Sequence, residues 1–452
     1  MGVYPEPGKR GITYEDLHPP LGLEFIASAV KDLVDKVTVV DMRYEAGPLP
    51  VLLAEADVIG LSVNWRQQKD LALEIAATIP PGPTVIVGGI QPTQDPAEFL
   101  KPSGRVDIVV LGDGEAAMRE IFSGRPLAEV RGIAYKENGR TTFTAARPLT
   151  PVTDLFPDRR LRRYAYRYRL PWGASFSIDC LMSSRGCCHH CEFCTYRLDS
   201  AGRKRPWAGR SAASVVDEIL TMDADLIIFT DDHFGQDVRR VEEICDRLIS
   251  LQVKKNLSCE TRIEIAKRPD ILRKMERAGF KGLSFGLESC QDKTLARIGK
   301  GFTRRDLEAA FRVLRSFDFF LVGYFIVGYI GESVSDALEI ADFAQGLGLD
   351  FIGLSFLRAF GHSSLRESLR SEPGYYIGEN DLVLRRGTSQ KDLEGLARSI
   401  VRRFYSPRQI LKIVAQGIRS PVPNGNLLNF ALTLMVTEWV GRQAKVRIGC
   451  LC

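Results

Sequence analysis

The first part of the chain alternates short apolar runs with amphipathic stretches. The runs expected to be strands are residues 36–41, 57–62, 84–88 and 108–111, and the amphipathic stretches expected to be helices are residues 23–33, 71–79 and 115–122. Strands of Val and Ile that are each followed by a helix are typical of a parallel sheet covered on both faces. We therefore expect a doubly wound α/β domain over residues 1–125, in which residues 1–7 offer only a stub where the first strand should lie.

A second alternation with a longer repeat occupies residues 171–370. Its expected strands are residues 176–178, 226–229, 257–260, 282–285, 322–327 and 351–356, with helical patterns between them. Six such units predict a partial (β/α)6 barrel, whose chemistry lies at the carboxyl ends of the strands. Residues 126–170 are expected to be a connector with a solvated basic run near its end, and residues 371–452 a small helical C-terminal region.

Length and composition exclude several classes of protein. The 452 residues are 45% hydrophobic and 26% charged, which is ordinary for a globular chain and excludes disordered and fibrous classes. The net charge of +5 is spread thinly, so we expect no nucleic-acid partner. No apolar run reaches the roughly 18–20 residues of a membrane span, and no signal peptide opens the chain. These features predict a cytoplasmic protein without a transmembrane segment.

The ten cysteines are too few for a disulfide scaffold, and four of them fall within residues 187–194. Cys187, Cys191 and Cys194 follow the first barrel strand with the spacing C-x3-C-x2-C. A 4Fe–4S cluster takes four thiolate ligands, so three leave one iron open to a substrate or cofactor. The alternative is a zinc site completed by Cys188, His189 and His190. Adjacent residues project in different directions, which favours the iron–sulfur cluster.

The segment from Ser184 to Cys194 resembles the signature of the radical S-adenosylmethionine (SAM) superfamily. The resemblance implies that Cys187, Cys191 and Cys194 hold a 4Fe–4S cluster whose fourth iron is chelated by SAM. It also implies that Phe193 lies near the adenine of SAM.

Short motifs at four further strand ends extend the resemblance over residues 176–360. The residues that it assigns to SAM are Asp231 and Asp232 near the amino group, Arg262 at the carboxylate, Glu288 and Ser289 at the ribose, and Val327, Gly328 and Glu332 at the adenine. Each motif alone is weak, since Asp231 or Glu288 could be an ordinary helix cap. Because the five motifs occur in order, each at the carboxyl end of a successive strand, together they strongly support the resemblance.

One strand end departs from the family pattern. Many members carry a Pro-Gly-Thr-like turn after the sixth strand, whereas this chain reads Ala-Phe-Gly-His-Ser-Ser at residues 359–364. Because that turn is expected to face the substrate, the substrate does not transfer by analogy. His362 within the turn is either a surface-loop residue or a proton-transfer group.

The N-terminal domain resembles the cobalamin-binding domain that precedes many radical SAM modules. The residues that carry this resemblance or are expected near the corrin are Leu21, Asn64, Trp65, Arg66, Gly88, Gly89, Gln91, Gly112, Gly114 and Glu115. Glycines at strand ends let a flat macrocycle approach the backbone. Cobalamin domains often place an axial histidine in a loop that here corresponds to residues 41–47, which contain none. The resemblance therefore implies cobalt without a lower histidine ligand.

Together the two resemblances imply a cobalamin-dependent radical SAM enzyme, most simply a methyltransferase. One SAM would yield a 5′-deoxyadenosyl radical that takes hydrogen from an unactivated carbon, and another would supply the methyl group through methylcobalamin. The implied partners are a small-molecule substrate and a reductant such as flavodoxin or ferredoxin. The alternatives are a cobalamin-binding cyclase or rearrangement enzyme and, less well supported, a non-catalytic metal-binding module. A methylthiotransferase is disfavoured because no second group of cysteines precedes the loop.

Overall fold

The computed structural model divides the chain into two compact units. It describes residues 1–5, 18–45, 49–66, 68–149, 154–164, 166–169, 175–196, 198–199 and 201–411. The first unit takes the described residues of 1–5, 18–166 and 198–205, and the second takes those of 167–197 and 206–411.

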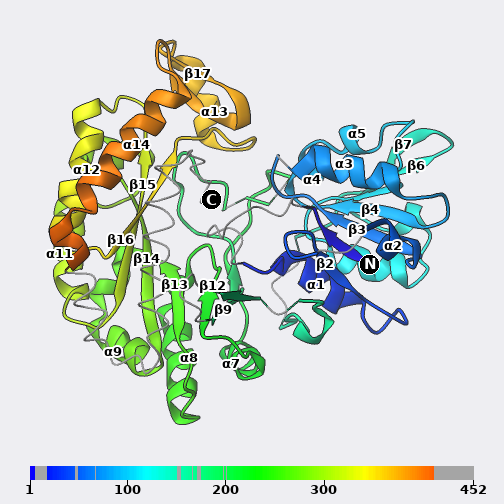
Figure 1. The fold of residues 1–452 in the computed structure, drawn as a ribbon, viewed down its shortest axis with the longest axis horizontal. Helices are drawn as coiled ribbons and strands as arrows, with labels where there is room; N and C mark the ends of the chain where they lie inside the picture. The colour runs from blue at the N-terminus through cyan, green and yellow to red at the C-terminus, as the bar shows by residue number, and fades with distance from the viewer. Residues whose placement is uncertain are drawn as a thin grey trace. The chain divides into compact units, whose positions relative to one another are not determined.

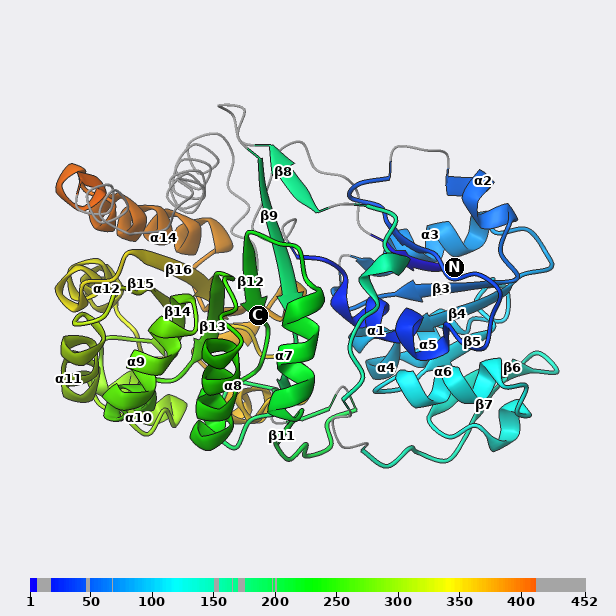
Figure 2. The ribbon, with the colours of Figure 1, turned by 90° about the horizontal axis from the view of Figure 1, so that it is seen from below.

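The first unit is built on a seven-stranded sheet with the order β2-β1-β3-β4-β5-β6-β7. Figure 2 labels its strands β3, β4, β5, β6 and β7. Its parallel strands are β1 (Gly2–Tyr4), β2 (Val39–Asp41), β3 (Val58–Ser62), β4 (Thr84–Gly88) and β5 (Ile108–Val110), followed by the antiparallel β6 (Ile133–Glu137) and β7 (Arg140–Phe143). The predicted doubly wound domain is thereby confirmed.

The expectation of a missing first strand is wrong. Residues 2–4 form β1 inside the sheet, where Val3 aligns with Val40 of β2 and Leu61 of β3. Three residues suffice here because both neighbours are hydrogen-bonded to them, and the amino group of Met1 adds a 2.6 Å bond to the Val58 carbonyl.

Helices cover both faces of this sheet. Residues of α2 (Leu49–Ala54), α3 (Gln68–Thr78) and α5 (Pro96–Phe99) pack with one face, and residues of α1 (Leu21–Val30) and α6 (Glu115–Phe122) pack with the other. Successive strand residues alternate between the two cores, as in β4, where Val85 and Val87 belong to one and Ile86 to the other. The short α4 (Ile90–Gln94) follows β4 directly.

The expected connector is more structured than its composition indicates. It contributes β6 and β7 to the first sheet, and part of its basic run is tied to the same unit by ion pairs. Arg162 forms a bidentate pair with Glu24, with distances of 2.6 and 2.8 Å, and both side chains are largely buried. Arg163 pairs with Glu45 at 2.9 Å. Some arginines of the basic run therefore form ion pairs within the unit, and the run is not only solvated surface.

The second unit is a curled sheet whose strands follow one another in sequence order (Figure 1). The strands are β9 (Ser175–Leu181), β12 (Leu226–Phe229), β13 (Leu257–Thr261), β14 (Phe280–Glu288), β15 (Phe320–Val327) and β16 (Phe351–Phe356), all parallel, with β8 (Arg167–Arg169) antiparallel at one edge. The six predicted barrel strands and the partial barrel are confirmed.

Six helices of this unit pack on one face of its sheet. They are α7 (Ala212–Thr221), α8 (Val238–Ser250), α9 (Pro269–Arg277), α10 (Asp292–Ile298), α11 (Arg304–Leu314) and α12 (Val334–Leu347), and their buried residues form one core with alternate strand residues. The strand residues between those, such as Ser258, Glu260, Ser284, Tyr324 and Ser355, lie on the opposite, inner face. Small and polar side chains on an inner face leave room for ligands.

The C-terminal part is mainly helical within the described residues. It contains α13 (Ser364–Ser368), α14 (Gln390–Phe404) and a two-stranded hairpin of β17 (Tyr375–Ile377) and β18 (Val383–Arg385). The remainder of the predicted region, residues 412–452, lies outside the described residues. Within the described part of the chain, no helix is long and apolar enough to cross a membrane.

Candidate active site

The cysteine-rich loop leaves the sheet after β9 and is turned by a glycine. Gly186 has φ +87° and donates its backbone N–H to Asp232 Oδ2 at 2.6 Å. Cys187 is half-buried, Cys191 is buried, and the Cys194 N–H donates to the Cys191 carbonyl at 3.1 Å. Three thiols are thereby presented by one loop at the carboxyl ends of the strands.

Glu192 anchors the middle of this loop. Its N–H donates to the Ile298 carbonyl, and its carboxylate accepts hydrogen bonds from Tyr329 at 2.7 Å and Ser368 at 2.5 Å. Burial and the bond to Glu192 raise the pKa of Tyr329, so the phenol remains a donor. Cys191 packs beside Tyr329 in a small apolar cluster to which the partly buried Phe193 and Cys194 also belong. The loop is thus held by elements far from it in sequence.

The zinc alternative does not match the donors that the structure brings together. Cys188 is exposed, and its Sγ lies 2.9 Å from Gln236 Oε1. Among the described residues, the donor atoms of Cys187, His189 and His233 lie within 4.8 Å of one another, whereas the sequence pointed to Cys188, His189 and His190. Burial lowers the pKa of His233 to about 4, so its imidazole is neutral at neutral pH.

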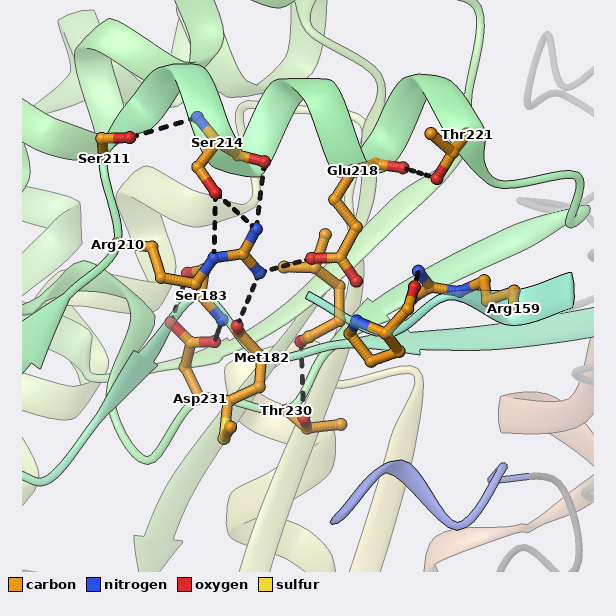
Figure 3. Close-up of polar contacts among 12 residues, drawn as sticks. Arg159, Met182, Ser183, Arg210, Ser211, Ser214, Glu218, Thr221, Thr230 and Asp231 are labelled. Carbon is orange, nitrogen blue, oxygen red and sulfur yellow. Dashed lines mark hydrogen bonds and ion pairs between the residues drawn. The ribbon is translucent and has the colours of Figure 1, made fainter. Parts of the chain in front are cut away.

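The two acidic residues after β12 accept hydrogen bonds from other residues of the protein. Asp231 is buried and accepts three hydrogen bonds from Ser183 and Ser184 at 2.5–2.7 Å, and Figure 3 shows its carboxylate bonded at Ser183. Asp232 accepts the Gly186 N–H described above. Both carboxylates therefore hold the start of the cysteine-rich loop in this structure.

A charged group gathers at the ends of β13 and β14. Arg262 donates to Glu264 at 2.9 Å and to the Lys300 carbonyl, and its guanidinium lies 5.2 Å from the Phe302 ring centroid. Lys300 Nζ lies 3.1 Å from Glu288 Oε1, and both side chains are almost buried. Burial lowers the pKa of Lys300, but the charges of Glu288 and Cys191 outweigh it and raise that pKa overall.

The backbone around Glu288 is shaped for this arrangement. Glu288 has φ +68°, which is unusual for a residue other than glycine and is costly unless its surroundings enforce it. A Cβ at Gly286 would lie 2.6 Å from Glu288 Oε1, so the glycine makes room for the folded-back carboxylate. On the inner face nearby, Glu260 is reached by solvent. Desolvation by the surrounding protein, followed by the charge of Glu288, nevertheless raises its pKa to about 7.

The turn after β15 is closed by Glu332. Gly328 has φ +84° and donates its N–H to Glu332 Oε2 at 2.7 Å, while Glu332 Oε1 is buried without a partner among the described residues. Burial raises the pKa of Glu332 to about 7. Val327 is buried, and Ser289 is buried with its hydroxyl accepting the Gln291 N–H at 3.1 Å. In this structure, the side chains of Val327 and Ser289 therefore contribute to local packing and hydrogen bonding.

At the carboxyl edge of the first sheet, three segments expected near a corrin meet. The Ile90 N–H donates to Asn64 Oδ1 at 3.3 Å, and the Thr93 hydroxyl accepts the Gly112 N–H at 3.0 Å. Gln68 accepts the N–H groups of Asn64 and Trp65. The rest of the expected set is distributed around this edge: Leu21 begins α1, Gln91 lies in α4, Gly114 and Glu115 open α6, and Arg66 is exposed.

Two family models match the chain over these two units. The radical SAM superfamily model matches residues 181–344, and the B12 binding domain model matches residues 9–122. The chain is a radical SAM enzyme with a B12-binding domain.

Relatives of the enzyme include methyltransferases and a cyclase. An uncharacterized methyltransferase from Pyrococcus horikoshii is 26% identical over 348 residues, which span 74% of each chain. The anaerobic magnesium-protoporphyrin IX monomethyl ester cyclase of Synechocystis sp. is 26% identical over 373 residues, or 76% of this chain and 70% of the relative. The radical SAM methyltransferase TsrM from Kitasatospora setae, with cobalamin and a [4Fe-4S] cluster bound, has a TM-score of 0.68 at 15% identity, over 98% of this chain and 99% of that chain.

The predicted cofactors, a 4Fe–4S cluster, SAM and cobalamin, are confirmed for the enzyme's two domains by the two family matches. The donor set fits the cluster, because one loop offers three thiols, of which that of Cys191 is buried and those of Cys187 and Cys194 are half-buried. Arg262 and buried Lys300 fit an anionic group. The open space beside Gly112, where a Cβ would meet nothing nearer than 3.9 Å, and the exposed Ile90 fit an apolar macrocycle. The individual ligand assignments stay predictions.

Sequence reasoning missed Lys300 and Glu192. A buried lysine paired with a glutamate is rare outside functional sites, but nothing in the sequence marks Lys300 as buried. Its position after the helix that follows Glu288 was the available signal. Glu192 was inside the recognised motif, yet its partners come from residues 297–368, so only the fold reveals them.

Proposed function

We propose that this radical SAM enzyme transfers a methyl group from SAM to an unactivated carbon of a small-molecule substrate. The observation that carries the proposal is the presence of a radical SAM domain and a B12-binding domain in one chain that matches a methyltransferase over 74% of both lengths. When bound, the cluster and SAM supply hydrogen abstraction, and cobalamin supplies a carrier for the methyl group.

The cysteine-rich loop provides the cluster ligands in this proposal. Cys187, Cys191 and Cys194 hold the iron, and Glu192, fixed by Tyr329 and Ser368, keeps their loop in place. The apolar cluster behind Cys191 excludes water from that side of the metal site. Exposed Cys188 takes no part.

The charged group at the ends of β13 and β14 holds SAM. Arg262 and Lys300 offer cationic donors for the carboxylate of SAM, and Glu288 offers an acceptor for its hydroxyl or amino groups. The backbone of Val327 and Gly328 is available to the adenine edge, with Glu332 closing the turn behind it. A one-electron donor such as flavodoxin or ferredoxin completes the reaction.

The substrate faces the inner side of the partial barrel. Ser284, Tyr324 and Ser355 lie on that face and present hydroxyl groups, which suit a substrate with polar substituents around the reacting carbon. Glu260 lies in the same row as Ser284 and adds an acidic group to that face.

The test uses anaerobically reconstituted protein supplied with cobalamin, a reductant and SAM labelled in its methyl group. We expect the label to appear on the bound corrin and 5′-deoxyadenosine to form. Cys191→Ala should abolish both products, whereas the matched Cys188→Ala should retain them, because Cys188 points to Gln236. A Cys188→Ala protein that cannot hold iron would contradict the ligand set.

A second candidate function is a cyclisation, favoured by the cyclase relative. It predicts 5′-deoxyadenosine formation with bound cobalamin but no label on the corrin. Retention of an intact cluster without any corrin would contradict both candidates.

A further inference from the structure

The short connection from β9 to the first cluster cysteine is held by residues distant in sequence. Residues 182–186 lie between the end of β9 and Cys187. On one side, Asp231 Oδ1 accepts the Ser183 N–H at 2.7 Å, and Asp231 Oδ2 accepts the hydroxyls of Ser183 and Ser184, each at 2.5 Å. Asp231 is only 3% exposed, so water does not compete for these bonds.

Two buried arginines hold the carbonyl groups of the same connection. Arg210 Nη1 donates to the Met182 carbonyl at 3.1 Å, and Arg240 Nη2 donates to the Ser183 carbonyl at 2.7 Å. The backbone N–H of Arg210 also donates to the Ser183 carbonyl, at 2.9 Å. Figure 3 shows the Arg210 guanidinium between the helix that carries Ser214 and Glu218 and the backbone at Met182.

The arginines are themselves fixed by hydrogen bonds. Arg210 Nη2 donates to Ser214 Oγ at 2.8 Å, and its Nη1 forms a buried ion pair with Glu218 of α7. Arg240 of α8 donates through Nε to the Arg210 carbonyl at 2.7 Å, which links the two arginines. Arg240 lies close enough to Asp231 for their opposite charges to stabilise each other.

Burying this much charge needs a reason other than stability. A buried ion pair contributes little net stability compared with apolar residues of the same size, because both charges lose their hydration. The fork of a guanidinium, however, fixes two directions at once, which an apolar side chain cannot do. The bonds concentrate on the few residues before Cys187, where backbone freedom would move that thiol directly.

We propose that Arg240, Arg210 and Asp231 are positioning residues that clamp residues 182–186 and thereby fix Cys187 relative to Cys191 and Cys194. The clamp rests on the proposed ligand set, since it acts only if Cys187 binds the cluster. It touches neither SAM nor substrate in this proposal, and it keeps the cluster's geometry constant while SAM is bound and cleaved.

The experiment compares Arg240→Met with Arg247→Met in the full-length, anaerobically reconstituted protein. Arg247 lies on the same helix, but its side chain is 47% exposed and pairs with Glu243 on the surface. The measurements are the rate of iron release to a ferrous chelator and the electron paramagnetic resonance spectrum of the reduced cluster, with and without SAM. We expect Arg240→Met to release iron about tenfold faster, as loss of a charged hydrogen bond predicts, and to show an altered spectrum. Arg247→Met should match the wild type.

Arg240→Lys keeps the proposal falsifiable if the methionine variant does not fold. Lysine retains the charge but cannot reach both the Arg210 and the Ser183 carbonyls in the fork geometry, so iron release should be faster than in the wild type and slower than in the methionine variant. Wild-type release and an unchanged spectrum in a folded Arg240 variant would overturn the clamp. A Cys187→Ala protein that keeps its cluster would overturn the ligand set instead, and the clamp with it.

Discussion

Buried Lys300 contacts charged residues from two strand ends of the candidate active site. Its ammonium lies 3.1 Å from Glu288, while its carbonyl accepts from Arg262, so one residue joins two strand ends that the sequence separates. The proximity of Cys191 to Lys300, which contributes to raising the lysine pKa, places this charge beside the cluster loop as well.

A prediction at the scale of the residue follows for Lys300→Met. The variant removes a cation from the proposed SAM carboxylate site and leaves Glu288 without its buried partner, so SAM affinity should fall about ten- to a hundredfold. Equilibrium binding of SAM to reconstituted protein measures this, with iron content expected to stay at the wild-type value. Lys293→Met is the matched control, because Lys293 is 60% exposed and pairs with Asp336 on the surface. Unchanged SAM affinity in Lys300→Met would contradict the assignment.

Glu332 carries a prediction about pH. Burial raises its pKa from 4.5 to about 7 in the folded protein, so folding favours the protonated form. The folded state therefore loses stability as the pH rises from about 4.5 to about 7, and Glu332→Gln should remove a loss on the order of 3 kcal/mol. Urea unfolding of both proteins across that pH range measures the difference. The exposed Glu308→Gln should follow the wild type, and parallel curves for Glu332→Gln would contradict the raised pKa.

At the scale of the element, the end of β4 and the residue that follows it give two adjacent glycines different roles. Gly89 has φ +115°, and a Cβ there would lie 2.5 Å from the Val63 carbonyl of the same domain. Gly88 has no such restriction, since its nearest contact would be Val110 Cβ at 3.7 Å. A bulky residue at Gly89 therefore disturbs the fold before it disturbs a ligand.

We accordingly expect Gly88→Leu and Gly89→Ala to fail differently. Gly89→Ala should lower the free energy of unfolding by about 1–3 kcal/mol, the cost of a strained left-handed backbone. Gly88→Leu should keep the wild-type unfolding midpoint but lose hydroxocobalamin on desalting, because its side chain fills the space expected for the corrin. Full retention of cobalamin by Gly88→Leu would remove Gly88 from the corrin site.

At the scale of the whole molecule, two units with separate cores predict two separable responses to ligands. The contact pattern divides the described chain into a first unit with the B12-binding match and a second with the radical SAM match. A ligand stabilises the unit that binds it, by about 2.7 kcal/mol at a hundredfold excess over its dissociation constant.

Calorimetry of the full-length protein should therefore show two unfolding transitions. Hydroxocobalamin should raise the midpoint of one, and SAM added to the reconstituted enzyme should raise the other. Cys191→Ala should lose only the SAM response, since its first unit is unchanged. A single transition that moves with both ligands would show that the two units unfold as one.

The sequence alone determined the architecture to within a few residues at most strand ends. Apolar runs predicted all six barrel strands, and β12 and β16 begin and end where the runs do. It failed at residues 2–4, where a strand of three residues is stable only because β2 and β3 flank it. The sequence also did not predict that Arg162 would be buried against Glu24, because an ion pair between residues so far apart in the chain leaves no local pattern.

For the active site, the sequence determined which chemistry is present, and the tertiary structure decided which residues serve it from within. The spacing of Cys187, Cys191 and Cys194 is a local property of one loop, so it is legible without a fold. The roles of Asp231 and Arg240 depend on partners 47 and 57 residues away, and a carboxylate or guanidinium looks the same in sequence whether it meets a ligand or a buried carbonyl. Burial and hydrogen-bond geometry make that distinction, and both arise only when the strands, helices and loop are packed together.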